Sequence, residues 1–268
     1  MAPEARHEYS VDLFQFKDPD RPGYTSPTPM GLLVIDSFSK LCTVEPLDDK
    51  TAISWINVFE KAVDKLGGKP KVVFSDPDSS MDSASMGDYF FLKKKHNIER
   101  IRTKQHASIA ERAIRTIKDQ LYKRLKHNNV TLGRGVDWTS MLKEVLYDYN
   151  HNKHRSTGMT PKEASKEKND FEVRTNLIIH SRRDRVYPEI RENDKVYAYR
   201  KKKINDKQYV GVWSETADKI HSVKKAHGQT LYRLNPAGLW HIRADLLKLH
   251  HSQQRPPEPL RPAYSRDT

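Results

Sequence analysis

The sequence predicts an α/β domain that is followed by a small β-barrel. Short apolar strands and amphipathic helices alternate as far as about residue 168. The composition then turns polar, and five short β-rich segments follow between Glu189 and Leu249. The length of 268 residues also fits two domains, because domains usually have roughly 100–200 residues.

Three strands form the predicted start of the sheet. The alternation of apolar and polar residues in EYSVDLFQF predicts a strand over residues 8–16, and the Pro- and Gly-containing residues 17–29 predict a loop. GLLVID, residues 31–36, is typical of a strand that is buried on both faces. LCTVEPL, residues 41–47, suits its hairpin partner.

Apolar residues at helical spacing and short apolar runs predict the rest of the first domain, which we place at residues 5–168. The predicted elements are a helix over residues 51–66 that ends at Gly67–Gly68, a strand over 72–74, a helix around 89–95, a strand around 98–102, and helices over 108–126 and 138–150. This order of strands and helices is that of a ribonuclease-H-like α/β domain.

The second half of the chain has three predicted parts. Residues 169–186 are polar, include the basic cluster SRRDR, and are interpreted as a linker. Residues 187–250 contain KVYAYR, YVGVW, DKIHSV, TLYRL and ADLLKL, five segments that predict the strands of a small barrel. Residues 251–268 are rich in Pro and Arg, which predicts a disordered tail.

Composition limits the classes of function. Lys and Arg number 48 against 35 Asp and Glu, a formal charge of +13, which favours a polyanionic partner. No apolar run approaches the roughly 18 residues that cross a bilayer, and a signal-peptide pattern is absent, so we expect a soluble intracellular protein. The single cysteine, Cys42, excludes an internal disulfide and a zinc site with two thiolates.

Three acidic residues suit a two-metal site, in which ions about 3.5–4 Å apart need carboxylates from separate elements. Asp12 lies inside an apolar-rich strand, where a carboxylate is unfavourable unless it is paired or metal-bound. Asp76 follows the strand VVFS, at the end where open α/β sheets bind ligands. Glu111 lies in the first turn of the long helix.

Each of these residues also has a simpler interpretation. Asp12 could be a turn or capping residue, and Asp76 could be a helix N-cap. Glu111 could pair with Arg115, four residues later on the same helix. A chain without a metal site at these residues requires all three simpler interpretations to be correct at once.

Several motifs resemble retroviral integrases and their transposon relatives. The family pattern is a strand Asp, a strand-end Asp and a helical Glu, and here 34 residues lie between Asp76 and Glu111. HASIAERAIRTIKDQLYKRL, residues 106–125, is similar to the segment that carries the family's catalytic glutamate. YNHNKHRSTGMTPKEA, residues 149–164, is similar to the signature that follows the core.

The C-terminal segments NDKVYAYRKKK, TLYRL and HIRADLLKL resemble the SH3-like barrel in integrases of Polinton (Maverick) elements and related viruses. In the family the first carboxylate lies on the strand before GLLVID, so the resemblance points to Asp12 rather than Asp36. It covers about residues 8–250. It implies a DDE integrase with Asp12, Asp76 and Glu111 as catalytic metal ligands.

The resemblance also implies the reaction and its partners. Two Mg²⁺ or Mn²⁺ ions per active site would support 3′-end processing and strand transfer of mobile-element or viral DNA into target DNA. The partners would be double-stranded DNA and further copies of this chain, as a dimer or tetramer. The expected site of action is the nucleus.

Basic residues are candidates for holding the DNA. Arg115 and Lys118 follow Glu111 by four and seven residues and share its helix face, although they could form a solvated face only. Arg112 lies off this face and is a weaker candidate. The cluster RKKK could likewise be a charged hairpin loop. The predicted DNA-binding residues are Lys104, His106, Arg115, Lys118, Arg200, Lys201 and Lys202.

Two departures from the family leave an alternative open. SDPDSS, residues 75–80, lacks the Asn-Gly that commonly follows the second aspartate. The zinc-binding N-terminal domain of retroviral integrases is also absent, which fits either a branch without it or an excerpted chain. The alternative is a domesticated, inactive integrase that binds DNA or tethers chromatin.

Overall fold

The computed structural model describes residues 2–16, 28–75, 89–90, 98–102, 108–132, 137–181, 187–199, 213–226, 229–236 and 238–249. The chain divides into two compact units. The first comprises Met1–Arg185 with His227–Gln229, and the second comprises Val186–Ala226 with Thr230–Thr268. Within the ranges just given, no helix has both the length and the apolar character that crossing a membrane would require.

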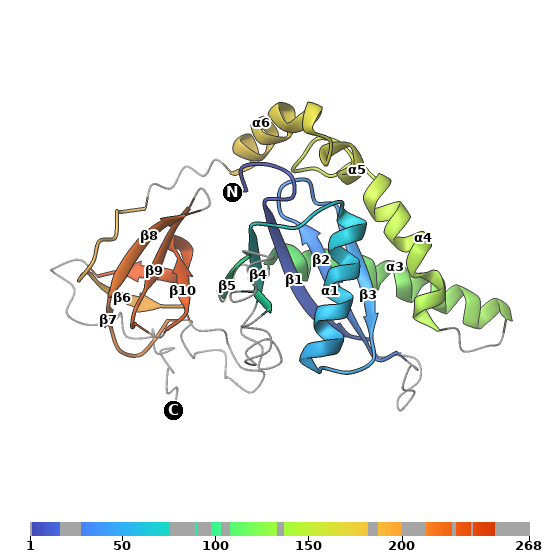
Figure 1. Cartoon of the computed structure of the whole chain (residues 1–268), viewed down its shortest axis with the longest axis horizontal. Helices are drawn as coiled ribbons and strands as arrows, with labels where there is room; N and C mark the ends of the chain where they lie inside the picture. The colour runs from blue at the N-terminus through green and yellow to red at the C-terminus, as the bar shows by residue number, and fades with distance from the viewer. Residues whose placement is uncertain are drawn as a thin grey trace, which may run out of the picture. The chain divides into compact units, whose positions relative to one another are not determined.

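A mixed five-stranded sheet with the order β3-β2-β1-β4-β5 is the centre of the first unit (Figure 1). β1 pairs antiparallel with β2, which pairs antiparallel with β3, whereas β1–β4 and β4–β5 are parallel. The five strands predicted for this domain are confirmed. They are β1 (Glu8–Gln15), β2 (Met30–Asp36), β3 (Cys42–Leu47), β4 (Val72–Ser75) and β5 (Glu99–Arg102).

Helices cover both faces of this sheet (Figure 1). α1 (Ala52–Leu66) packs on one face, where Tyr9 and Val11 of β1 contact a cluster that contains Trp55 and Phe59. α3 (Ser108–Leu132) and α4 (Trp138–His151) pack on the other face, where their apolar residues surround Phe14 and other inward residues of β1–β3. Side chains alternate along a strand, so β1, β2 and β3 each contribute to both clusters.

The ends of α1 agree with its sequence signals. The Thr51 hydroxyl accepts a hydrogen bond from the Ser54 backbone N–H at 3.3 Å, as an N-cap does. Gly67 has φ 85°, the left-handed conformation that ends many helices and that glycine adopts without strain. The helix predicted over 138–150 matches α4 to one residue, whereas the helix predicted over 108–126 continues to Leu132 in α3. The helix predicted around residues 89–95 lies largely outside the described residues.

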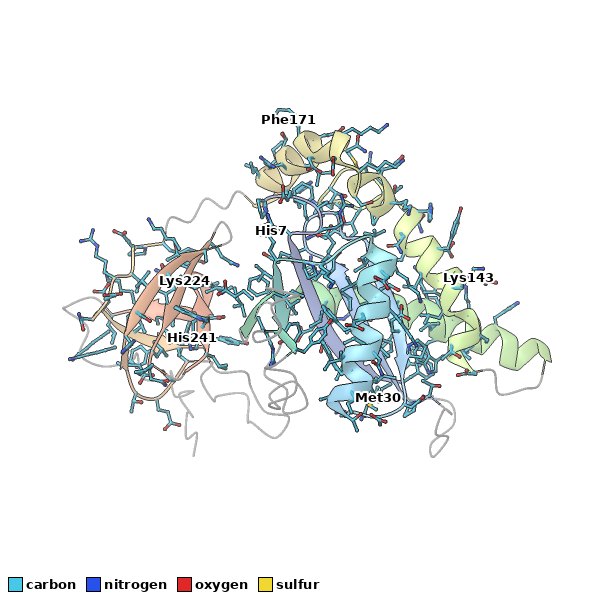
Figure 2. All side chains as sticks on the ribbon, viewed as in Figure 1. His7, Met30, Lys143, Phe171, Lys224 and His241 are labelled. Atoms are coloured by element: carbon cyan, nitrogen blue, oxygen red, sulfur yellow. The ribbon has the colours of Figure 1, made fainter. Side chains whose placement is uncertain are left out.

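The expectation of a linker over residues 169–186 is wrong for most of that range. α5 (Pro161–Ala164) and a short 3₁₀ helix (Glu167–Asn169) lead into α6, Asp170–Ser181. Val173 and Leu177 of α6 are buried in a further apolar cluster with Phe38. The helical pattern was hard to detect because Phe171 is 84% exposed and points away from the cluster (Figure 2), so apolar residues lie on both faces of α6.

The second unit is a small all-β unit with its own core, which includes Ile190, Val196, Tyr232 and Leu246. Its strands form two sheets of three, with the orders β10-β9-β8 and β11-β6-β7. They are β6 (Lys195–Ala198), β7 (Asp218–Lys219), β8 (Ser222–Ala226), β9 (Gln229–Arg233), β10 (Trp240–Ile242) and β11 (Leu246–Lys248).

The predicted strands of this second unit are only partly matched. DKIHSV forms two strands, β7 and β8, instead of one, because the chain changes sheets between them. β10 was not predicted, and most of YVGVW and all of residues 251–268 lie outside the described residues. The SH3-like class of this unit stays a prediction.

Candidate active site

Asp12 lies in the middle of the central strand and on the face that α3 and α4 cover. Val11 and Leu13 on either side of it pack towards α1, whereas Phe14 packs among residues of α3 and α4. Alternation along β1 therefore directs the Asp12 carboxylate to the α3 side of the sheet. Asp12 is half-buried and is opposite Leu33 of β2.

The parallel pairing of β1 with β4 sets the register of the two strands that precede the first and second candidate carboxylates in the sequence. The last described pair of this ladder is Val11↔Ser75, and in the sequence Asp12 and Asp76 each come one residue later. The carboxyl ends of these two parallel strands lie at one edge of the sheet. Ser75 is buried and its hydroxyl accepts a hydrogen bond from Arg100 Nε at 3.1 Å. Asp76 itself lies outside the described residues.

Glu111 is exposed and lies in the first turn of α3, as predicted. The adjacent Ala110 and Ile114 are buried against the same sheet face that carries Asp12. Among the residues that the structure describes, no group of three His, Cys, Asp or Glu could hold a metal ion. One of the three predicted ligands, Asp76, is outside that set, so the complete triad is not tested by this result.

Asp36, the competing first carboxylate, has a different environment. It is buried, and its oxygens accept hydrogen bonds from the backbone N–H groups of Arg6 and Phe38 and from the Ser39 hydroxyl, at 3.2, 3.1 and 2.6 Å. Burial raises the pKa of Asp36, and these hydrogen bonds oppose that rise. The carboxylate stabilises the β2–β3 turn.

The position of Asp36 also separates it from the candidate site. Asp36 pairs with Tyr9 in the antiparallel β1–β2 ladder. Tyr9 precedes Asp12 by three residues, which is about 10 Å along a strand. Asp36 is thus at the amino end of β1, away from the edge at which Val11 and Ser75 pair.

Lys118 lies against the carboxyl end of β1. Its ammonium donates a hydrogen bond to the Gln15 carbonyl at 3.1 Å and lies 5.9 Å from the ring centroids of both Phe14 and Tyr122. Burial lowers the pKa of Lys118. Arg115 is exposed on the same helix face as Glu111. The predicted residues Lys104, His106, Arg200, Lys201 and Lys202 lie outside the described residues.

The motif YNHNKHRSTGMTPKEA, residues 149–164, has structural roles that the sequence did not reveal. Asn150 binds the edge of β3 twice, because its Oδ1 accepts from the Cys42 N–H at 3.0 Å and its Nδ2 donates to the Cys42 carbonyl at 2.8 Å. Gly158 has φ 74°, and a Cβ there would be 2.5 Å from Asn176 Nδ2. Asn176 Nδ2 in turn donates to the Thr157 carbonyl at 2.9 Å and joins this turn to α6.

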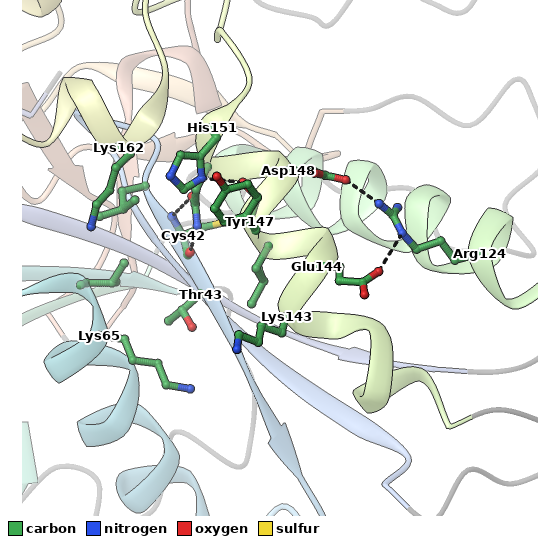
Figure 3. A pocket seen from close by; sticks show the side chains of 14 residues that line it. Cys42, Thr43, Lys65, Arg124, Lys143, Glu144, Tyr147, Asp148, His151 and Lys162 are labelled. Carbon is green, nitrogen blue, oxygen red and sulfur yellow. Dashed lines mark hydrogen bonds and ion pairs between the residues drawn. The ribbon is translucent and has the colours of Figure 1, made fainter.

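A cavity of about 700 Å³ lies between α1, β3, α3 and α4 (Figure 3). Its two carboxylates, Glu144 and Asp148, both pair with Arg124, at 3.9 and 2.5 Å. The rings of Tyr147 and His151 stack at a centroid distance of 4.0 Å beside them. The two acidic groups of this cavity therefore share one arginine as an ion-pair partner.

Comparisons with known proteins support the fold. No family model and no curated protein matches the sequence. A chain in the structure of the simian T-cell lymphotropic virus intasome in complex with PP2A regulatory subunit B56 gamma has a TM-score of 0.57 at 17% identity, covering 94% of this chain and 81% of that chain. This similarity shows that the present chain has the fold of retroviral integrases, with a ribonuclease-H-like core and a mixed sheet.

Two structures of the HTLV-2 integrase catalytic core domain in complex with magnesium are also similar. The trimeric and dimeric forms have TM-scores of 0.49 and 0.48, each at 18% identity. Each covers 62% of this chain and 100% of that chain. The predicted fold of the first domain is confirmed by the intasome comparison, on which the assignment rests.

Proposed function

We propose that this protein is a DNA integrase that carries out metal-dependent 3′-end processing and strand transfer. The observation that carries the proposal is the parallel pair Val11↔Ser75, which precedes Asp12 and Asp76 by one residue each. Consecutive Cα atoms are about 3.8 Å apart, so Asp12 lies within one residue of this paired position. Glu111 comes from α3, which packs on the same face as Asp12.

The three carboxylates suit hard divalent cations. Asp12, Asp76 and Glu111 supply oxygen ligands from two strands and a helix, which is the donor chemistry that Mg²⁺ and Mn²⁺ prefer. A half-buried carboxylate in a strand, such as Asp12, is stabilised by a bound cation. Two such ions would lower the pKa of the attacking oxygen and stabilise the leaving one.

The basic residues around the carboxylates would position the DNA. Lys118 holds its ammonium at the end of β1, and Arg115 lies on the same face of α3 as Glu111. Both charges suit phosphate oxygens on either side of the scissile bond. Lys104, His106, Arg200, Lys201 and Lys202 are proposed to extend this contact. Attack by water or by a DNA 3′-hydroxyl would be in line with the leaving oxygen and would form no covalent protein intermediate.

The wider setting is also a proposal. The motifs of the second unit favour a branch related to Polinton (Maverick) elements and an SH3-like barrel that binds DNA. Joining two DNA ends to one target requires a dimer or tetramer, and in a eukaryotic host the reaction would occur in the nucleus. The second candidate function, an inactive integrase that binds DNA or tethers chromatin, is favoured by the departure SDPDSS at residues 75–80.

A strand-transfer assay tests the proposal. Labelled duplex ends and a plasmid target are incubated with Mg²⁺ or Mn²⁺ and the wild type, Asp12→Asn or Glu111→Gln. We expect joined and nicked products with the wild type and their loss in both variants. Asp64→Asn and Glu172→Gln are the matched controls, because these acids are exposed on α1 and α6. Both controls should keep the products.

Two outcomes would count against the proposal. If the wild type binds the DNA but makes no product with either metal, the inactive-integrase function replaces it. If Asp12→Asn retains full joining activity and Asp36→Asn abolishes it without unfolding the protein, the proposed triad is wrong.

A further inference from the structure

A cluster of cations lines a cavity of the first unit that the proposed reaction does not use. Residues from the start of β1, the β2–β3 turn, α3 and the turn after α4 line this cavity. We call the four residues Lys40, Arg112, His154 and Arg155 the basic pocket, because all of them line this cavity. They come from three separate segments of the chain, so the sequence alone does not bring them together.

Two members of the basic pocket are held in place. Lys40 has φ 67° in the β2–β3 turn, and its ammonium donates a hydrogen bond to the Ser37 carbonyl at 2.5 Å. His154 Nδ1 lies 3.1 Å from the Ser156 hydroxyl. When that hydroxyl donates to Nδ1, His154 keeps its proton on Nε2, which is then a donor for another group. Arg112 and Arg155 are exposed and therefore free to adjust to a ligand.

The positive charge of the basic pocket is poorly compensated. Within the part of the chain that the structure describes, no carboxylate lies within ion-pair distance of Lys40, Arg112, His154 or Arg155. Burial and the charge of Arg112 lower the pKa of Lys40 to about 8, although Asp36 and Glu8 act in the opposite direction. Burial, Lys40 and Arg112 also lower the pKa of His154. Cations that disfavour one another in this way are stabilised by an anion.

Among the described residues, Glu8 is the one carboxylate that lines the cavity, and it does not remove this excess. Glu8 is 2% exposed, and its Oε2 atom has no hydrogen-bond partner within that part of the chain. Burial raises the pKa of Glu8, which favours the neutral acid. A neutral Glu8 is a hydrogen-bond donor and is compatible with an anion in the cavity.

We propose that the basic pocket binds a phosphate group, with a dianionic monoester preferred to a diester. Two guanidinium groups present the paired donors that match phosphate oxygens, and Lys40 adds a point charge. Three members of the pocket, Lys40, Arg112 and Arg155, are cations at pH 7 and balance a dianion better than a monoanion. The Ser37 hydroxyl lines the same cavity and is a further donor. Inorganic phosphate and the terminal phosphate of a DNA end are two sources of this group.

The proposal is independent of the integrase reaction, because the carboxylates Asp12, Asp76 and Glu111 take no part in it. The first experiment measures the thermal unfolding midpoint of the full chain in EDTA as inorganic phosphate replaces chloride at constant ionic strength. A ligand that binds only the folded state raises the midpoint by mass action. We expect a rise for the wild type and a phosphate Kd at least tenfold weaker in Lys40→Met and in Arg112→Gln.

Lys61→Met is the matched control, because Lys61 is exposed on α1 and does not line the cavity. It should keep the phosphate response of the wild type. Lys40→Met removes a buried charge and no apolar packing, so the variant should stay folded. Loss of its phosphate response can therefore be distinguished from unfolding. An unchanged response in Lys40→Met, or no phosphate-specific rise in the wild type, would overturn the proposal.

A second experiment identifies the source of the phosphate group. A short DNA duplex with a 5′-phosphate and the same duplex without it are titrated into the wild type, Lys40→Met and Lys61→Met in EDTA. A preference for the phosphorylated duplex that disappears only in Lys40→Met assigns the pocket to a DNA end. Equal binding of both duplexes, together with the phosphate response above, assigns it to a free phosphate compound. If a dinucleoside phosphate diester raises the unfolding midpoint as much as inorganic phosphate does, the preference for a monoester is wrong.

Discussion

At the scale of single residues, two strand aspartates differ in what surrounds them. Asp36 is buried and accepts three hydrogen bonds within its own turn and from Arg6. Asp12 is half-buried on the α3 face, near the edge where the parallel strands β1 and β4 end. The same carboxylate group is thus a turn-stabilising acceptor at one position and the proposed metal ligand at the other.

Asp36→Asn should lower the free energy of unfolding by about 1–3 kcal/mol, because an amide has one acceptor oxygen where the carboxylate has two. In either orientation the NH₂ group would face a backbone N–H, that of Arg6 or that of Phe38. Urea denaturation measures the change, and the exposed Asp64→Asn variant is the control. A stability equal to that of the wild type would mean that these hydrogen bonds contribute little. The folded variant should retain strand transfer.

Lys40 should make stability depend on pH. Its pKa is about 8 in the folded protein and about 10.5 when unfolded, so between these values only the unfolded chain keeps the proton. Stability therefore rises with pH across this interval, and the charged form of Lys40 destabilises the fold below pH 8. Lys40→Met should be more stable than the wild type at pH 7, by up to about 3 kcal/mol.

The measurement for Lys40 is the difference in unfolding free energy between wild type and Lys40→Met at several pH values. Other groups titrate in the same range, including tyrosines whose pKa burial raises, and they cancel in the difference. The advantage of the variant should shrink as the pH rises from 8 to 10.5. A difference that does not vary with pH would show that Lys40 keeps an ordinary pKa.

At the scale of elements, α6 belongs to the first unit although its sequence is polar on average. It buries Val173 and Leu177 against Phe38, and Asn176 binds the turn at Thr157. Its remaining apolar residues, Phe171, Ile178 and Ile179, are exposed. The helix is therefore held by its buried apolar side chains, by the Asn176 amide, and by a hydrogen bond from Arg174 to the Pro3 carbonyl at 2.7 Å.

Leu177→Ala should destabilise the first unit by about 2–4 kcal/mol, since it removes a buried leucine side chain and leaves a cavity. Ile179→Ala is the matched control, because Ile179 is 58% exposed on the same helix and should change stability by less than about 0.5 kcal/mol. Chemical denaturation of both variants measures the contrast. Equal effects would mean that α6 does not pack as described.

At the scale of the whole molecule, the two units have separate hydrophobic cores. The first unit has three clusters around its sheet and α6, and the second has a cluster of its own around Val196 and Tyr232. Each unit thus has the buried apolar residues that independent folding requires.

A fragment of residues 1–185 should unfold cooperatively by itself. The sheet, α1, α3, α4 and α6 are all contained in it, so the loss of the second unit removes none of their buried clusters. Circular dichroism during urea denaturation measures the transition of the fragment and of the full chain. A fragment without a cooperative transition would show that the first unit depends on the second.

The sequence predicted the first unit well because each element carried a local signal. Strand alternation located β1, apolar runs located β2–β4, and Thr51 and Gly67 marked the ends of α1. The signal failed at α6, where apolar residues occur on both faces, and in the second unit, where two-residue and three-residue strands are too short to show periodicity. Asp76 and five predicted DNA-binding residues lie outside the described residues, so their roles remain predictions.

By itself the sequence determined the elements of the core, the candidate carboxylates and the basic character of the protein, because propensity, periodicity and charge are local properties. Only the tertiary structure showed that Asp12 and Asp36 have different surroundings, because these depend on strand register and on which face of the sheet a side chain occupies. The basic pocket likewise depends on the fold. Lys40, Arg112 and His154 are far apart in the sequence and come together only when α3 and the turn after α4 pack beside the β2–β3 turn.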